Sequence, residues 1–150
     1  MYQNSRRNNH YSKDVNQSSL TQEKVKFYID GKVDRNLYNI KAENIASILA
    51  EASKDTNSYT QLRRFYDEVV DFYDEIESSK DKNSAFEIRE PLILMLNSKV
   101  SYALGRKKVD ENFVNFIKYS LNQVKNYDDF KVFKLLFEAV MGFLRAKKAK

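Results

Sequence analysis

Turn-forming residues are scarce in this chain, and their scarcity limits what the chain can fold into. Pro91 is the only proline, and Gly31, Gly105 and Gly142 are the only glycines in 150 residues. A strand-rich domain of this length needs more turn residues than that. Because 42% of the residues are hydrophobic, the chain can still form a core. The sequence therefore predicts an all-α fold, a compact bundle of about five helices.

The N-terminal part differs in composition from the rest. The first ~20 residues are mostly Asn, Ser, Gln, Arg and Tyr with almost no aliphatic side chains, a composition typical of disorder. Asp30-Gly31 favours a type I′ turn, so a short hairpin is predicted within residues 25–33. We therefore expect an N-terminal tail over residues 1–38, mostly disordered with a short hairpin, and a helical bundle domain over residues 39–150.

Apolar residues recur at helical spacing from residue 39 onward. They predict helices over residues 39–53, 58–78, 91–104, 111–125 and 129–147. Ser58 and Gln61 have the spacing of a capping box at the start of the second helix. Asp110 and Asp128 are expected to cap the fourth and fifth helices, and Gly105 to follow the third as its C′ residue.

Two helices carry further expectations. Proline disrupts a helix interior, so residues 84–90, before Pro91, are expected to form a separate turn or a kinked extension. The last helix is apolar nearly all round, which is typical of a helix at the centre of a bundle or of one covered by a second chain.

The residue counts exclude several kinds of chemistry. There is no cysteine, and the single histidine, His10, lies in the polar tail. Zinc fingers, iron–sulfur clusters, thiol nucleophiles and disulfide scaffolds are therefore excluded. No apolar run approaches the ~20 residues of a membrane span, and the N-terminus lacks the apolar stretch of a signal peptide. We expect a soluble, cytoplasmic protein with no cofactor and no membrane partner.

Acidic residues on the second helix suggest a metal site as one alternative. Asp67, Asp71 and Asp74 fall on one face, and three carboxylates on one face can hold a divalent cation. A metal-dependent hydrolase is therefore one rival interpretation. However, the stripe lies opposite the apolar face, no predicted helix contains a histidine, and no nucleophile has an adjacent activator. A solvated acidic face is the simpler interpretation, with no catalytic residue and no metal ligand.

Arg63 and Arg64 stand where a helix disfavours cations. They lie in the first turns of the second helix, at the positive end of the macrodipole. One interpretation pairs Arg63 with Asp67 and Arg64 with Glu68, at i,i+4 spacing. The other is an anion site, in which both guanidiniums, nearby Lys54 and the free N–H groups of the first turn converge on a phosphate.

Basic residues also gather elsewhere in the chain. Residues 41–80 carry five basic and nine acidic side chains, whereas residues 81–150 carry 14 and eight. The loop Arg106-Lys107-Lys108 has more cations than capping needs. The cations of residues 145–150 suit the negative end of the last helix. Surfaces of opposite sign suit an anionic partner, self-association, or both.

Three segments, in chain order, resemble the small subunit of type III-A CRISPR–Cas effector (Csm) complexes. Residues 60–66, T-Q-L-R-R-F-Y, resemble a segment built around Q-L-R. Residues 99–106 resemble a K-x-x-Y-x-x-G-R stretch that closes the middle helix. Residues 133–143 resemble a terminal helix with an aromatic–F-E-A–hydrophobic pattern. The resemblance spans residues 56–147, and it departs from the family at Gly142-Phe143, where Ala-Tyr is frequent, and at Pro91.

The resemblance implies a helical bundle that is not an enzyme and that takes part in antiviral defence. Copies of such subunits stack end to end beside the subunits that hold the guide RNA. For the isolated chain, a monomer and a homodimer both stay open. They touch the backbone of the guide–target RNA duplex through basic residues. The expected RNA-binding residues are Arg63, Arg64 and Arg106 from the motifs, Lys54 and Lys99 near them, and Lys107 and Lys108 in the basic loop. A protein–protein adaptor that binds no nucleic acid and docks through the last helix is the other alternative.

Overall fold

The computed structural model describes residues 19–148. Its elements are a 3₁₀ turn Glu23–Val25, strands β1 (Tyr28–Ile29) and β2 (Lys32–Val33), a π-helical turn Leu37–Lys41, and helices α2 (Ala42–Ala50), α3 (Tyr59–Glu77), α4 (Lys82–Leu94), α5 (Leu96–Gly105), α6 (Glu111–Leu121) and α7 (Tyr127–Lys147). Only Met95 separates α4 from α5. The prediction of an all-α bundle of about five helices is confirmed.

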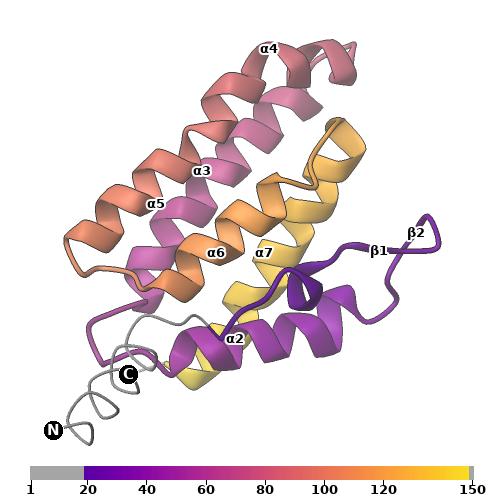
Figure 1. Cartoon of the computed structure of the whole chain (residues 1–150). Coiled ribbons are helices and arrows are strands. Elements are labelled where there is room, and N and C mark those ends of the chain that lie inside the picture. Colours follow the sequence, from indigo (N-terminus) through magenta and orange to yellow (C-terminus); the bar gives the residue numbers. More distant parts are fainter. Residues whose placement is uncertain (1–18, 149–150) are drawn as a thin grey trace, which may run out of the picture.

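Two antiparallel pairs and a crossing helix form the bundle (Figure 1). The chain runs along α3 and returns along α4 and α5, which follow one another as a single long rod. Helices α6 and α7 form the second pair, and α2 lies across α7. The start of α3, the end of α5, the start of α6 and the end of α7 meet at one end of the bundle, called here the basal end.

Helix α7 lies at the centre of the fold. It packs against α2, α3, α4 and the π-helical turn. Its buried side chains continue a cluster of phenylalanine rings, in which Phe137 lies 5.3 Å from Phe116 and 5.8 Å from Phe133 between ring centroids. Burying each such ring contributes about 1.5–3 kcal/mol. The apolar character of α7 is therefore explained by the core of its own chain, so α7 does not offer the docking face that the adaptor alternative requires.

Residues 19–38 pack against the helices, although the sequence-based division assigned them to the tail. Leu20, Val25, Phe27 and Leu37 are buried in the common core. The side-chain amide of Gln123 accepts a hydrogen bond from the Phe27 N–H at 2.8 Å and donates one to the Val25 carbonyl at 3.0 Å. The amide thus makes the two hydrogen bonds that a neighbouring strand would make to this backbone. The tail prediction for residues 1–18 lies outside the described residues.

The predicted hairpin is present, shortened to two residues a strand. Tyr28 pairs with Val33 and Ile29 with Lys32. Asp30 and Gly31 have φ values of 52° and 78°, the two positive values that a type I′ turn requires.

The helix starts partly follow the sequence prediction. Ser58 accepts a hydrogen bond from the Gln61 N–H, and Asp110 accepts one from the Phe113 N–H, so both residues cap their helices. Only the Ser58 half of the predicted capping box forms, because the Gln61 side chain makes no return bond within residues 19–148. The cap predicted at Asp128 is wrong. Asn126 caps α7 by accepting from the Asp129 N–H, which begins the helix earlier and leaves Asp128 in its first turn.

The C′ position predicted at Gly105 is also wrong. Gly105 is the last residue of α5, and Lys107 adopts the left-handed conformation, with φ at 62°. The Lys107 N–H donates to the Leu104 carbonyl, and the Lys108 N–H donates to the Ala103 carbonyl. These are the two bonds of a Schellman motif, here with a lysine where glycine is usual.

Pro91 lies inside α4, not at the start of a helix as predicted. A proline there removes one hydrogen bond, to the Glu87 carbonyl. Both Pro91 and Glu87 are exposed, so water can replace the missing bond. The helix is instead interrupted at Met95. Within residues 19–148 no helix combines the length and the hydropathy that a membrane crossing requires.

Candidate nucleic-acid interface

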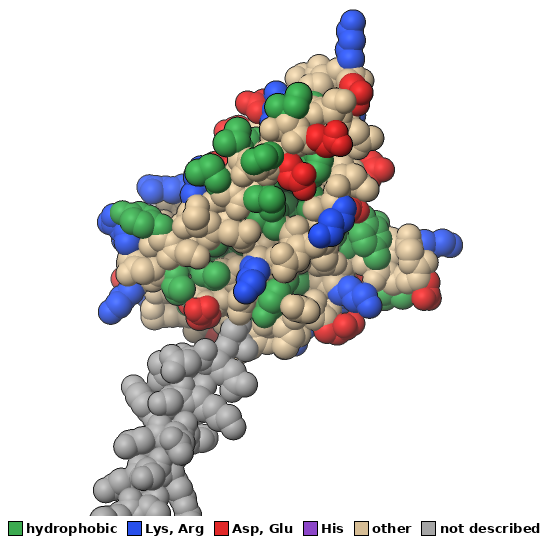
Figure 2. All heavy atoms as spheres, turned by 45° about the horizontal axis from the view of Figure 1, so that its top comes forward, with side chains coloured by type: hydrophobic (Ala, Val, Ile, Leu, Met, Phe, Trp, Pro, Cys, Tyr) green, Lys and Arg blue, Asp and Glu red, His purple; other side chains and the backbone are tan. Residues whose placement is uncertain are grey.

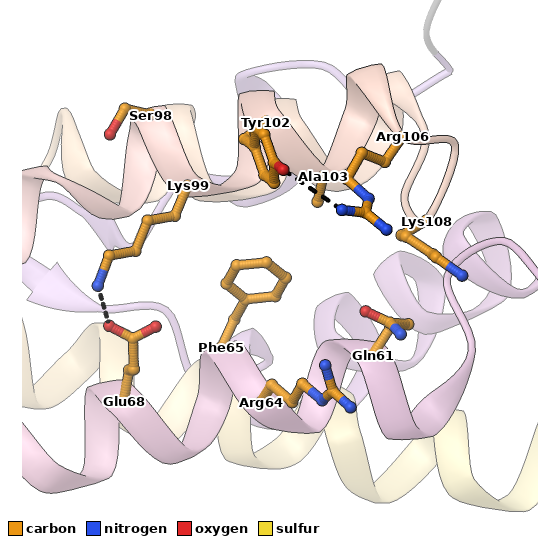
Figure 3. A pocket seen from close by; sticks show the side chains of 10 residues that line it. All are labelled: Gln61, Arg64, Phe65, Glu68, Ser98, Lys99, Tyr102, Ala103, Arg106 and Lys108. Carbon is orange, nitrogen blue, oxygen red and sulfur yellow. Dashed lines mark hydrogen bonds and ion pairs between the residues drawn. The ribbon is translucent and has the colours of Figure 1, made fainter.

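A groove of about 560 Å³ opens between α3 and α5 near the basal end. It exists because α4 packs against α3 whereas α5, farther along the rod, packs against α6. Figure 3 shows side chains of both helices converging on the space between them, with Phe65 at its floor. The Phe65 ring lies 5.5 Å from that of Phe113, which connects the groove floor to the core. Side chains on its rim are therefore held by a rigid base.

Four of the seven predicted RNA-binding residues line this groove. They are Arg64 from α3, Lys99 from α5, and Arg106 and Lys108 from the loop that follows α5. Glu68 is the one carboxylate in the lining. Since the four cations come from segments about 40 residues apart, only the fold assembles them.

Three of these cations are available to a ligand. The side chains of Arg64 and Lys108 make no hydrogen bond or ion pair with any residue of the described chain. Within residues 19–148, the Arg106 side chain donates only to the Tyr102 hydroxyl, at 3.3 Å, and lies over the ring of that tyrosine. Lys99, in contrast, pairs with Glu68 at 2.6 Å. The predicted pair between Arg64 and Glu68 is therefore absent, because Lys99 takes the carboxylate.

Arg63 does not reach the groove. Its Nε donates to Asp67 at 2.9 Å and its Nη1 to the Tyr59 hydroxyl at 3.0 Å. The hydrogen bond that Arg63 donates to Asp67 is the main reason why the pKa of Arg63 is raised. The prediction of an Arg63–Asp67 pair is thus confirmed, and the single phosphate site with both arginines and Lys54 is not formed.

Lys54 and Lys107 also lie outside the groove. Lys54 lines a second cavity, on the α7 side of α3, together with Arg145, Lys147 and Lys148. Lys107 occupies the left-handed position of the Schellman motif, and its side chain is exposed. The groove therefore combines only part of the basic loop with the Q-L-R helix.

The sequence interpretation missed the C-terminal cations as candidate site residues. It assigned Arg145, Lys147 and Lys148 to compensation of the helix dipole. No signal in the sequence connects them to Lys54, more than 90 residues earlier, because that contact follows from how α7 crosses the start of α3.

The aspartates of α3 do not form a metal centre. Asp67 is occupied by Arg63, and Asp71 and Asp74 are exposed on the side of α3 that faces away from the core. Across residues 19–148 no three His, Cys, Asp or Glu side chains lie close enough together to hold a metal ion. This region offers no support for the hydrolase interpretation.

An apolar strip runs along the solvent side of α4 and the break that follows it. Ile88 is 75% exposed, Leu92 54% and Met95 48%. Figure 2 shows hydrophobic side chains gathered on the face that contains α4. These residues recur at i, i+4 and i+7, on the side opposite buried Ile93. Apolar side chains placed away from the core are typical of a contact surface for another protein.

A family model described as Csm2 Type III-A matches residues 32–150 of the chain. The match covers the second strand of the hairpin and all six α-helices of the described structure. No curated protein and no solved structure gives a significant match.

Proposed function

The chain belongs to the Csm2 family, the small subunits of type III-A CRISPR complexes, and on that premise we propose that its α3–α5 groove contacts the backbone of the guide–target RNA duplex. The observation that carries the proposal is a set of three cations on one groove, Arg64, Arg106 and Lys108, none of which forms an ion pair with a carboxylate of residues 19–148. Phosphate oxygens are the partners that such guanidinium and ammonium groups prefer.

The position of Arg64 supports this ligand. A cation in the first turns of a helix opposes the macrodipole, and α3 has no acidic residue in its first turn to offset it. Arg64 gains nothing from a carboxylate in the described chain, so it lowers the stability of the free protein slightly. A phosphate in the groove would be attracted both by Arg64 and by the N-terminal end of α3.

The groove favours backbone contact over the reading of bases. Its charged groups come from long, flexible side chains on the rim, and Phe65 at its floor is packed against the core. Backbone contacts position a protein without reading sequence. Sequence recognition is then left to base pairing between guide and target. Tyr102, which is 67% exposed beside Arg106, adds an aromatic surface at the edge of the groove.

The same proposal makes the chain a non-catalytic subunit of the cytoplasm that contacts other proteins. Its copies stack along the complex, and isolated copies pair. The apolar strip of Ile88, Leu92 and Met95 supports a protein contact, since a subunit of an assembly must bury surface that its own fold leaves open. In the adaptor alternative, this strip would be the docking surface in place of the last helix.

The test is RNA binding over a salt series. The probe is an RNA duplex of about 20 base pairs with an arbitrary sequence, and the variant is Arg64→Glu with Arg106→Glu. The slope of log K against log salt is negative, and each lost phosphate contact makes it shallower by about 0.7–0.9. We expect a shallower slope and at least tenfold weaker binding at low salt, with unchanged helicity.

The matched control is Arg35→Glu with Lys131→Glu. Both residues are exposed, and the control changes the net charge by the same amount. If the groove variant and the control weaken binding equally, only the overall charge matters and the groove is not the contact. If the wild-type chain binds no RNA at low salt, the protein-only adaptor is favoured instead.

A further inference from the structure

A second cavity of about 560 Å³ lies between the start of α3 and the end of α7. Four cations line it, namely Lys54, Arg145, Lys147 and Lys148, together with Asp55 and the hydroxyl-bearing residues Ser58, Tyr59 and Thr60. Lys54 comes from the loop before α3, and the other three come from the end of α7. The cavity is thus built by two segments that the fold brings together.

Most of this positive charge has no partner within residues 19–148. The side chains of Lys54 and Lys147 make no ion pair or hydrogen bond in the described structure. Arg145 lies 4.8 Å from the centroid of the Tyr59 ring and pairs with no carboxylate in residues 19–148. Lys148 has a different role. Its Nζ donates to the Thr56 carbonyl at 2.6 Å and fixes the loop, and burial lowers its pKa.

Compensation of helix dipoles explains only part of the cluster. Arg145 and Lys147 suit the negative end of α7. Lys54, however, stands beside the positive end of α3, where a cation is unfavourable. Asp55 is the one acidic residue in the lining, so the cavity keeps a clear positive excess.

We propose that this cavity binds a second phosphate of the RNA, distinct from the phosphate in the α3–α5 groove. The inference rests on the proposed RNA contact and extends it. The first two turns of α3 then lie between two segments of RNA backbone, with Arg64 and Arg106 on one side and Lys54 and Lys147 on the other.

The width of α3 requires two separate phosphates. An α-helix with its side chains is about 10–12 Å across, and the two cavities lie on its two flanks. One phosphate cannot touch both. The contributions of the two sites to binding should therefore add, as they do for residues without a shared partner.

The experiment compares three variants with wild type on the same RNA duplex and salt series. The cavity variant is Lys54→Glu with Lys147→Glu, which leaves the structural Lys148 and the Arg145–Tyr59 contact in place. The groove variant is Arg64→Glu with Arg106→Glu, and the third variant combines all four changes. We expect the slope of log K against log salt to be shallower in the cavity variant, by the amount that the loss of about one to two phosphate contacts gives. The combined variant should show the sum of the changes seen in the groove and cavity variants.

The outcomes separate the inference from the proposed function. If the groove variant weakens binding and the cavity variant matches wild type, the second site is overturned and the groove contact stands. If only the cavity variant weakens binding, the groove contact fails and the cavity is supported. If the cavity variant changes self-association in sedimentation and leaves RNA binding intact, the cations serve a protein partner and the inference fails.

Discussion

Asn57 and Asp110 exchange two hydrogen bonds at the basal end of the bundle. The Asn57 Nδ2 donates to the Asp110 Oδ1 at 2.8 Å, and the Asp110 N–H donates to the Asn57 Oδ1 at 3.0 Å. Asn57 also donates to the Leu49 carbonyl, is fully buried, and has a φ of 57°. One side chain thus joins the end of α2, the loop before α3 and the cap of α6. It holds in place the loops that border both cavities.

Replacement of Asn57 should therefore destabilise the fold. Asn57→Gly keeps the left-handed backbone and removes the side-chain bonds, at a cost of about 2–3 kcal/mol. Asn57→Ala adds the cost of a non-glycine residue in that conformation, about 1 kcal/mol more. Urea denaturation measures both. If Asn57→Gly is as stable as wild type, the side-chain bonds do not contribute as described.

The Schellman motif makes a paired prediction at the end of α5. Lys107→Gly should raise the free energy of unfolding by up to about 1 kcal/mol, because glycine tolerates a φ of 62°. Gly105→Ala should be neutral or stabilising by about 0.5 kcal/mol, because Gly105 is helical and, apart from its chain neighbours and the backbone of its own helix, no atom lies within 4 Å of the added Cβ. Thermal unfolding measures both variants. If Lys107→Gly gives no gain in stability and Gly105→Ala is destabilising, Gly105 occupies the C′ position after all.

Docking of residues 20–38 should depend on Gln123. Gln123→Leu puts an apolar side chain of similar size in place of the amide and removes both hydrogen bonds to the segment. We expect a loss of about 1–3 kcal/mol and faster exchange of the Phe27 amide proton. Gln22→Leu, a change at an exposed position of the same segment, serves as control. Equal exchange rates in wild type and Gln123→Leu would show that burial alone holds the segment.

Stability should fall below about pH 5. The pKa of Asp81 lies below its ordinary value because the carboxylate accepts the Ser84 N–H, and that of Glu138 is lowered by the hydrogen bond from Lys134. A lowered folded-state pKa gives stability that is present above the unfolded pKa of about 4 and is lost as pH falls through the folded value.

Asp81→Asn tests this pH dependence. Asparagine caps a helix as well as aspartate does, so stability at pH 7 should change little. The decline of unfolding free energy between pH 6 and 3, followed by urea denaturation, should be shallower than in wild type. Curves that run parallel in the two proteins would rule out a contribution from Asp81.

Local patterns in the sequence predicted the features that depend on local physics. The helices follow from apolar residues at a period of 3.6, and the caps at Ser58 and Asp110 follow from side chains that satisfy nearby N–H groups. The Asp30-Gly31 turn follows from the need for two positive φ values. The C′ prediction at Gly105 was wrong because it rested on residue preference alone. The fold decides where the chain after α5 turns, since Val109 must enter the core.

Long-range contacts were beyond such patterns. Nothing in the sequence around Phe27 indicates that the Gln123 side chain forms hydrogen bonds with the backbone there. Likewise, the neighbouring arginines 63 and 64 look alike in sequence, yet they point to different sides of α3. Arg63 is held by Asp67, whereas Arg64 has no side-chain partner within residues 19–148. The difference comes from α5, whose Lys99 pairs with the Glu68 carboxylate.

The order of charges along α3 has a consequence for how the protein approaches a ligand. Cations stand near its N-terminus and carboxylates follow toward its C-terminus, so the side-chain charges reinforce the backbone dipole over about 21 Å. Helix α3 therefore contributes an electric moment along its axis. In the field of a polyanion, this moment turns the basal end of the protein toward the polyanion before contact. Most of the salt sensitivity should then appear in the association rate, with dissociation left nearly constant.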